Sequence, residues 1–263
     1  MNSREEQINH FAESLRQAQE QRKTISPIRE TIGVEDLELA YAIQKANTDY
    51  RKHQGERMVG YKIGLTSHAV QRQLGVDQPD FGILFNTMEI QNGGFISITE
   101  ILQPKIETEV AFVLKSDLIQ KQFTAIDIIS AIDYALVSLE IVGSRIENWN
   151  IKITDTIADN ASASHFVLGH RPVKMNDFDV VTCKMTMNKN GEKVSEGSGA
   201  ACLGSPINAA IWLAEKFSSL GTPLKKGDLL LTGAVGPMVP VAAGDHIVAQ
   251  IEGLGSVSVK FTN

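Results

Sequence analysis

The stretch Lys105-Ile106-Glu107-Thr108-Glu109-Val110-Ala111-Phe112-Val113-Leu114 places two glutamates at the start of an apolar run. Residues i and i+2 of a β-strand point to the same side, so Glu107 and Glu109 project together while the apolar run leads into a core. Two neighbouring carboxylates repel unless a proton or a cation lies between them. Oxygen ligands favour a hard divalent ion such as Mg²⁺ or Mn²⁺. A solvated strand face with two ordinary surface glutamates fits this stretch equally well, so the rest of the chain must decide.

The sequence around this stretch changes character near residue 58. From there on, short apolar segments alternate with glycine-rich turns, which is typical of strands. We expect strands over residues 58–65, 109–114, 134–142, 166–168, 180–188, 229–232, 246–252 and 256–261. Asn190-Gly191 is a strong hairpin-turn signal.

Helical periodicity is concentrated before residue 58 and recurs in only two later segments. We expect helices over residues 4–23, 34–52, 123–131 and 206–220. Ser26-Pro27 separates the first two. The pattern predicts an α+β fold, with a small helical subdomain at residues 1–57 and a larger domain at residues 58–263 that contains a curved, mostly antiparallel sheet.

Composition excludes several classes of protein. The chain has 263 residues, a hydrophobic content of 43% and a formal net charge of −6, which is typical of an ordinary globular protein. No stripe of lysine and arginine indicates a nucleic-acid surface. An anionic substrate would therefore need local positive charge, from a metal ion or from particular lysines.

Cysteine spacing and the N-terminus indicate the compartment. Cys183 and Cys202 match no zinc spacing, and we expect both to be buried thiols in a reducing environment. The first residues lack the apolar stretch of a signal peptide, and no window approaches the roughly 20 apolar residues of a membrane span. We expect a cytoplasmic protein.

A third acidic side chain lies in an apolar context. Glu140 stands within Ser138-Leu139-Glu140-Ile141-Val142, and a charged residue in such a strand is rarely buried without a partner. The plainer alternative is an edge-strand glutamate that faces water. Three carboxylates around one Mg²⁺ would leave room for substrate oxygens and water, because Mg²⁺ prefers six ligands.

Two further side chains are candidates for acid–base chemistry. Lys62 lies in the apolar segment Gly60-Tyr61-Lys62-Ile63-Gly64, where it either extends to the surface or holds a carboxylate or enolate oxygen. Asp80 lies in Asp77-Gln78-Pro79-Asp80-Phe81-Gly82. That segment is either a proline-containing turn or the site of an acid–base group beside a metal-bound substrate.

Two loops are candidates for contact with a ligand. Asp159-Asn160-Ala161-Ser162-Ala163-Ser164 either makes local turns or presents hydroxyl and N–H groups to an oxyanion. Thr232-Gly233-Ala234-Val235-Gly236-Pro237-Met238 follows an apolar strand, which suggests close approach of a ligand, but its spacing is not that of a phosphate-binding loop. His68 and His165 lie near these loops, and the six histidines form no ligand pattern.

Taken in order, these segments resemble the fumarylacetoacetate hydrolase superfamily and, within it, the 2-keto-4-pentenoate hydratases of aromatic meta-cleavage pathways. The resemblance runs from about residue 34 to residue 261. The stretches that carry it are Gly60-Tyr61-Lys62-Ile63-Gly64-Leu65-Thr66, Gln78-Pro79-Asp80-Phe81-Gly82, Pro104-Lys105-Ile106-Glu107-Thr108-Glu109, Leu139-Glu140-Ile141-Val142-Gly143-Ser144-Arg145, Asp159-Asn160-Ala161-Ser162 and Thr232-Gly233-Ala234-Val235-Gly236-Pro237-Met238.

The resemblance implies a role for each candidate. Glu107, Glu109 and Glu140 would be ligands of Mg²⁺ or Mn²⁺, Lys62 and Asp80 the catalytic residues, and Ser162, Thr232 and Gly233 substrate-binding residues. The implied reaction adds water to 2-hydroxypenta-2,4-dienoate and gives 4-hydroxy-2-oxopentanoate. The larger domain would be a rolled β-sheet structure, and the chain would form a homo-oligomer.

Relatives with other activities stay as alternatives. Acylpyruvate and fumarylacetoacetate hydrolases typically place a His and a Glu three apart on a lid helix, whereas His68 is followed by Gln71. The 4-oxalocrotonate decarboxylases usually carry Thr-Gly-Gly-Ile-Thr where this chain has Thr232-Gly233-Ala234-Val235-Gly236. Gly143-Ser144-Arg145 replaces the Asp-Ala-Arg of hydratases for a longer diacid, which favours the five-carbon monoacid. A structural or channelling partner of a pathway decarboxylase is the alternative from another class.

Overall fold

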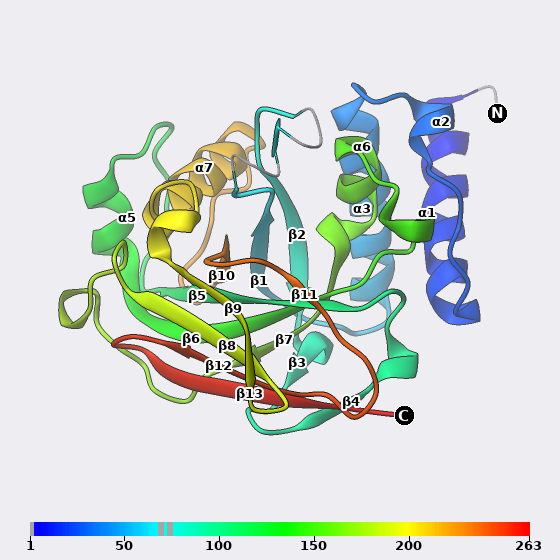
Figure 1. Cartoon of the computed structure of the whole chain (residues 1–263). Coiled ribbons are helices and arrows are strands. Elements are labelled where there is room, and N and C mark those ends of the chain that lie inside the picture. The colour runs from blue at the N-terminus through cyan, green and yellow to red at the C-terminus, as the bar shows by residue number, and fades with distance from the viewer. Residues whose placement is uncertain (1–2, 68–70, 73–75) are drawn as a thin grey trace.

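Two β-sheets pack against one another, and helices cover their flanks (Figure 1). The computed structural model describes residues 3–67, 71–72 and 76–263. The 8-stranded first sheet has the order β2-β1-β10-β5-β6-β7-β3, with β11 paired to β5. Its strands are β1 (Met58–Gly64), β2 (Asp80–Phe85), β3 (Glu89–Ile90), β5 (Lys105–Leu114), β6 (Ile132–Val142), β7 (Ala163–Leu168), β10 (Leu229–Ala234) and β11 (Val239–Pro240).

The 5-stranded second sheet lies across the first, because β12 and β13 contact β6, and β13 also contacts β7. Its strands, in spatial order, are β4 (Phe95–Ser97), β13 (Gly255–Thr262), β12 (His246–Ile251), β8 (Lys184–Lys189) and β9 (Glu192–Ser198). Three strand pairs are parallel, β1 with β10, β3 with β7 and β4 with β13, and the remaining pairs are antiparallel. The predicted α+β fold with a rolled, mostly antiparallel sheet is confirmed.

The two longest strands form the centre of the first sheet. β5 and β6 pair over almost their whole length, and their apolar side chains, such as Ile106, Phe112 and Leu139, are fully buried. Burial of each such side chain contributes about 1.5–3 kcal/mol. The carboxylates of these strands are therefore held on a framework that packing keeps rigid.

Three helices precede the first strand. α1 (Arg4–Gln21) begins at a capping box made by Ser3, and α3 (Leu37–His53) begins at the cap Asp36, each of which satisfies N–H groups at the helix start. The short α2 (Arg29–Ile32) follows the predicted break at Ser26-Pro27. The two predicted helices are thus confirmed, and α2 was not expected.

The N-terminal helices share one apolar core with a later helix, α6 (Ile153–Ala158). Ile43 of α3 lies in this core with Ile153 and Ile157 of α6. α5 (Ala125–Ala131) and α7 (Pro206–Ser219) are the two later helices that the sequence predicts, and they pack against each other beside the first sheet. The division into units at residues 1–57 and 58–263 stays a prediction.

Two of the differences from the sequence-based expectation concern the residue at which a strand begins. The segment around Pro79 was considered as a turn, but Asp80 already begins β2, in which every residue is buried. The strand expected over residues 180–188 begins only at Lys184, because the Asp179 carboxylate accepts hydrogen bonds from the N–H groups of Val181 and Thr182 and holds a turn there.

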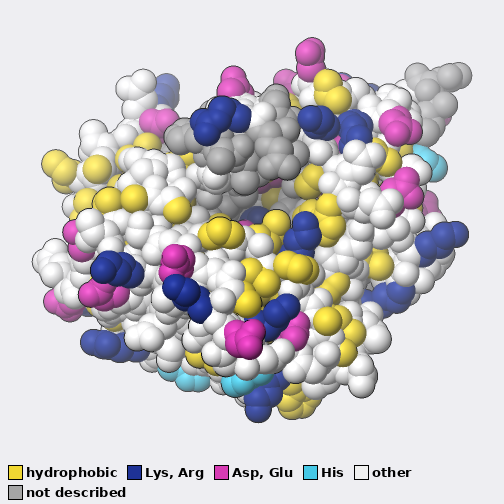
Figure 2. Space-filling model, in the orientation of Figure 1, with side chains coloured by type: hydrophobic (Ala, Val, Ile, Leu, Met, Phe, Trp, Pro, Cys, Tyr) yellow, Lys and Arg dark blue, Asp and Glu magenta, His cyan; other side chains and the backbone are white. Residues whose placement is uncertain are grey.

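Other expectations concern the surface and the thiols. Cys183 and Cys202 are both free and buried, as predicted. Figure 2 shows basic and acidic side chains interspersed on the face that it views. Of the helices in the described ranges, none combines the length and the apolar character needed to cross a membrane.

Candidate metal centre

Three glutamates converge on the two central strands. Glu107 lies directly opposite Glu140 in the β5–β6 ladder, and Glu109 follows on the same side of β5. One carboxylate oxygen from each lies within 4.8 Å of the others. Glu109 and Glu140 are both 0% exposed, and Glu107 is half-buried. Neither a solvated strand face nor an edge-strand glutamate describes this arrangement.

The cluster needs protons or a cation, because three carboxylates lie together and two of them are fully buried. Burial first, and then Glu140 and Glu107, raise the pKa of Glu109 well above its usual range. Burial likewise raises the pKa of Glu140 to about 8, against the attraction of Lys62 and with the repulsion of Glu107. Within the described residues Glu109 Oε1 accepts no hydrogen bond, and Lys62 is the donor that lies within ion-pair distance of Glu140. Buried carboxylate oxygens with so few donors fit a divalent cation of the Mg²⁺ type.

Lys62 of β1 supplies the ion pair. Its Nζ atom lies 3.1 Å from Glu140 Oε2 and donates a hydrogen bond of 3.0 Å to the carbonyl oxygen of Ala161. The residue is only 3% exposed, so it does not extend to the surface. Burial would lower the pKa of Lys62, but Glu140, Glu107 and Asp80 together raise it. The amine is therefore held as an ammonium beside the carboxylates.

Asp80 begins β2 next to β1, opposite Gly64. Its Oδ2 atom accepts a hydrogen bond of 3.1 Å from the Thr156 hydroxyl of α6, whereas its buried Oδ1 atom has no hydrogen-bond partner in the described part of the chain. Burial raises the pKa of Asp80, and Lys62 opposes the rise. A Cβ at Gly64 would lie 2.2 Å from Oδ1, so only glycine leaves room for this carboxylate.

The glycine-containing end of β10 contacts the cluster through its backbone. The N–H of Gly233 donates a hydrogen bond of 2.8 Å to Glu109 Oε2. Gly233 has a φ of +110°, and a Cβ there would lie 2.1 Å from Thr66 Oγ1, so the close approach requires glycine. The Thr232 hydroxyl donates to the carbonyl oxygen of Val110. The substrate-binding role of Thr232 and Gly233 stays a prediction.

The loop before β7 contacts Lys62 through the carbonyl oxygen of Ala161. The Ser162 hydroxyl is buried and has no hydrogen-bond partner among the residues that the structure describes, and its substrate-binding role stays a prediction. Sequence reasoning considered this loop as a source of hydroxyl and N–H groups. It missed the Ala161 carbonyl and the Thr156 hydroxyl, because neither stands out by residue type.

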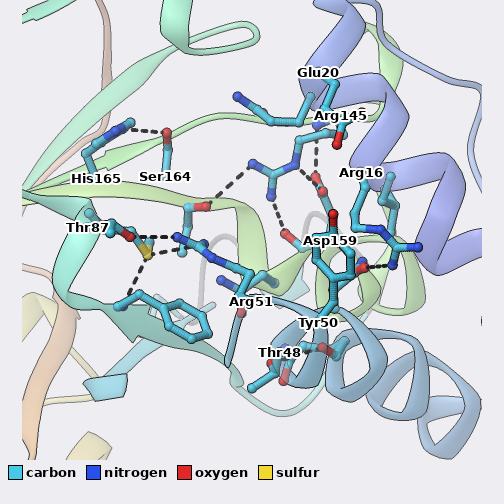
Figure 3. Close-up of a pocket in the computed structure, with 18 of the residues that line it drawn as sticks. Arg16, Glu20, Thr48, Tyr50, Arg51, Thr87, Arg145, Asp159, Ser164 and His165 are labelled. Carbon is cyan, nitrogen blue, oxygen red and sulfur yellow. Dashed lines mark hydrogen bonds and ion pairs between the residues drawn. The ribbon is translucent and has the colours of Figure 1, made fainter. Parts of the chain in front are cut away.

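A cavity of about 350 Å³ lies between the N-terminal helices and β7 (Figure 3). His165 lines it and pairs with Ile141 in the ladder, which places the cavity on the sheet face opposite to Glu140. Burial, followed by Arg51, Arg145 and Arg22, lowers the pKa of His165 to about 4. The other histidine singled out from the sequence, His68, lies outside the described residues.

Replacing His165 with glutamine is expected to weaken the acid sensitivity of the fold. In the unfolded chain His165 titrates near 6.5, so between that pH and about 4 the unfolded state binds more protons and the folded state loses stability as the pH falls. We expect the free energy of unfolding to fall by about 3 kcal/mol less in His165→Gln over this range. Urea titrations near neutral pH and near pH 4 measure the free energy of unfolding of the wild-type protein and of His165→Gln. An equal loss of this free energy in both proteins would contradict the prediction.

Comparison with known proteins places this site in a family. Residues 38–262 match the family model of the fumarylacetoacetate (FAA) hydrolase C-terminal domain. A 2-keto-4-pentenoate hydratase of Burkholderia vietnamiensis is 53% identical over 97% of both chains. The TodF product hydratase of Pseudomonas putida strain F1 is 51% identical over 97% of this chain and 95% of its own. The structure of 4-oxalocrotonate decarboxylase from Pseudomonas putida G7, complexed with magnesium and adipate, has a TM-score of 0.93 at 33% identity and covers 99% of both chains.

This chain thus belongs to the fumarylacetoacetate hydrolase family, and its rolled sheet matches the fold of that family. Its near full-length relatives at about half identity place it, within that family, among the 2-keto-4-pentenoate hydratases.

Proposed function

We propose that this chain is a metal-dependent hydro-lyase that adds water to 2-hydroxypenta-2,4-dienoate (2-oxopent-4-enoate) and gives 4-hydroxy-2-oxopentanoate in aromatic catabolism. One observation carries the proposal: three glutamates meet beside a buried ammonium in a chain 53% identical to a 2-keto-4-pentenoate hydratase. The family relation supports the substrate class, and the glutamate cluster supports the need for a cation.

Glu107, Glu109 and Glu140 would hold Mg²⁺ or Mn²⁺, because all three offer oxygen ligands. The decarboxylase of similar structure was solved with magnesium, which supports a divalent ion of this kind. When bound, the ion supplies Lewis-acid stabilisation of negative charge on the substrate's oxygens. Gly233 N–H and Lys62 would keep two of the carboxylates in place.

Lys62 would bind the developing negative charge of the substrate. An ammonium has three N–H donors. Ala161 accepts one of them and Glu140 lies within ion-pair distance, which leaves a donor for a substrate oxygen. We expect Lys62 to stabilise an anionic oxygen or to relay a proton to it.

Asp80 would act as the general acid–base group. Thr156 fixes one oxygen, so the other, Oδ1, keeps a defined direction and is free to exchange a proton. The raised pKa of this carboxyl group, caused by burial, suits an acid–base group that works near neutral pH. Ser162 would contact the substrate from the opposite loop.

We also propose that the enzyme is a cytoplasmic homo-oligomer, which can associate with a decarboxylase of its pathway. Light scattering of the purified protein tests the first part. Co-purification with such a decarboxylase tests the second.

Purified protein is expected to convert 2-hydroxypenta-2,4-dienoate to 4-hydroxy-2-oxopentanoate without a partner. A chelator should abolish the reaction, and Mg²⁺ or Mn²⁺ should restore it, because the buried carboxylates cannot polarise the substrate themselves. Loss of dienol absorbance and chromatography of the product measure this result.

The same preparation is tested for release of CO₂ from 4-oxalocrotonate, the reaction named for the relative with the TM-score of 0.93. Release of CO₂ without hydration would make the chain a decarboxylase. Hydration only in the presence of a decarboxylase would make it a channelling partner. Full activity after chelation would contradict the metal assignment.

A further inference from the structure

The segment that contacts Lys62 has an unusual backbone. Asn160, Ala161 and Ser162 have φ angles of 54°, 50° and 58°. Three consecutive residues other than glycine therefore have a left-handed backbone conformation. Each such residue costs free energy, and a run of them persists only where the surroundings fix it. The segment aims the Ala161 carbonyl oxygen at Lys62 Nζ, 3.0 Å away.

Arg145 holds both ends of this segment (Figure 3). Its Nε atom is hydrogen-bonded to Asp159 Oδ1, its own N–H donates to Asp159 Oδ2 at 2.9 Å, and its Nη2 atom donates to the Asp159 carbonyl oxygen at 2.6 Å. Its Nη1 atom lies 3.5 Å from the carbonyl oxygen of Ala163. The side chains of Arg145 and Asp159 are largely buried, with exposed fractions of 11% and 1%.

Other contacts fix the segment against β2. The Asn160 side chain accepts from the N–H of Ile83 at 2.7 Å and donates to its carbonyl oxygen at 3.0 Å. A Cβ at Gly82 would lie 2.3 Å from the Asn160 carbonyl oxygen. The segment is therefore held against β2 by the Asn160 side chain and at its ends by the Arg145 guanidinium, and of these two side chains Arg145 is the one that lies outside the segment.

We propose that Arg145, acting through Asp159, is a positioning residue that holds the Ala161 carbonyl against Lys62 and so fixes the direction of the lysine's remaining donor. The inference rests on the proposed function of Lys62. Arg145 lines the cavity, and within the described residues the hydrogen bonds that it donates go to Asp159 and Ala163 and not to the three glutamates. Its effect must pass through the left-handed segment.

The test combines Arg145→Gln with Lys62→Met in a double-mutant cycle. We expect Arg145→Gln to lower kcat by roughly 10- to 100-fold, with KM and Mn²⁺ affinity little changed, because the reacting groups are misplaced rather than lost. In the Lys62→Met background the same substitution should change kcat by less than about twofold, since its target is already absent. Equal losses in both backgrounds would overturn the proposal.

A matched control separates positioning from stability. Arg51 lines the same cavity and pairs with Glu56 at 2.6 Å, so Arg51→Gln also breaks an arginine–carboxylate pair. Hydrogen exchange of the amides at residues 160–163 should be faster in Arg145→Gln and unchanged in Arg51→Gln. Should Arg145→Gln not fold, Asp159→Asn removes the charge of the partner without loss of shape and should act in the same direction.

The exchange readout needs no turnover. If the wild-type protein has no hydratase activity, the proposed function fails, while faster exchange at residues 160–163 still supports the role of Arg145 in fixing the segment. Unchanged exchange in Arg145→Gln, or a loss of kcat in Arg51→Gln as large as that in Arg145→Gln, would overturn the positioning role itself.

Discussion

Glu109→Gln is expected to remove the divalent cation from the enzyme and to lower kcat/KM by about 10³-fold or more, because the ion supplies several kcal/mol of charge stabilisation. Glutamine has nearly the same shape as glutamate and can still accept the hydrogen bond from Gly233 N–H, so the fold should persist. It replaces a buried, charged ligand with a neutral one among two remaining carboxylates. Calorimetric titration with Mn²⁺ and steady-state kinetics measure the two losses.

The control for this substitution is Glu89→Gln, which removes an exposed glutamate from β3 of the same sheet. It should bind Mn²⁺ and turn over like the wild-type enzyme. Circular dichroism must show that metal-free Glu109→Gln stays folded. Near-normal turnover of Glu109→Gln in chelator-treated buffer would contradict the assignment of Glu109 as a ligand of the divalent cation.

Lys62→Met is expected to lower kcat by roughly 10²–10⁴-fold, the range typical of a lost acid–base or charge-stabilising group. The cation should stay bound, because removal of the ammonium 3.1 Å from Glu140 leaves the carboxylates with more negative charge to offer it. Methionine keeps much of the apolar stem that packs in the strand. Turnover at saturating substrate, together with the Mn²⁺ dissociation constant, separates the two effects.

Lys189→Met serves as the comparison, since Lys189 is a partly buried lysine in β8 of the second sheet and forms an ion pair with Asp245. Its kcat should equal that of the wild-type enzyme. An unchanged kcat in Lys62→Met would remove this lysine from the mechanism. If Lys62→Met instead no longer binds the cation, Lys62 belongs to the cation-binding site alone.

Much of the site could be predicted because its side chains follow the alternation of residues along a β-strand. Alternation in β5 predicted that Glu107 and Glu109 point the same way, and the structure places them so. That Glu140 meets them depends on the register between β5 and β6, in which Glu107 faces Glu140. Register arises from the packing of the whole sheet, so no local pattern could indicate it.

The parts that could not be predicted belong to the backbone and to long-range contacts. A carbonyl group is present in every residue, so nothing in the sequence marks that of Ala161 as the acceptor for Lys62. Thr156 reaches Asp80 only because α6 folds back against β2. Pro79 obscured the start of β2, because proline before a buried strand looks the same in sequence as proline within a turn.

The shared core of α6 and the N-terminal helices has a consequence for how small this enzyme can be. Thr156 stands on α6, and the ion pair between Arg29 and Asp155 ties that helix to the chain's first fifty residues. The orientation of Asp80 thus depends on contacts made by helices that contribute no ligand of their own. If Asp80 acts as proposed, we expect residues before Met58 to contribute to catalysis, and we expect the two sheets without them to be a poorer hydratase.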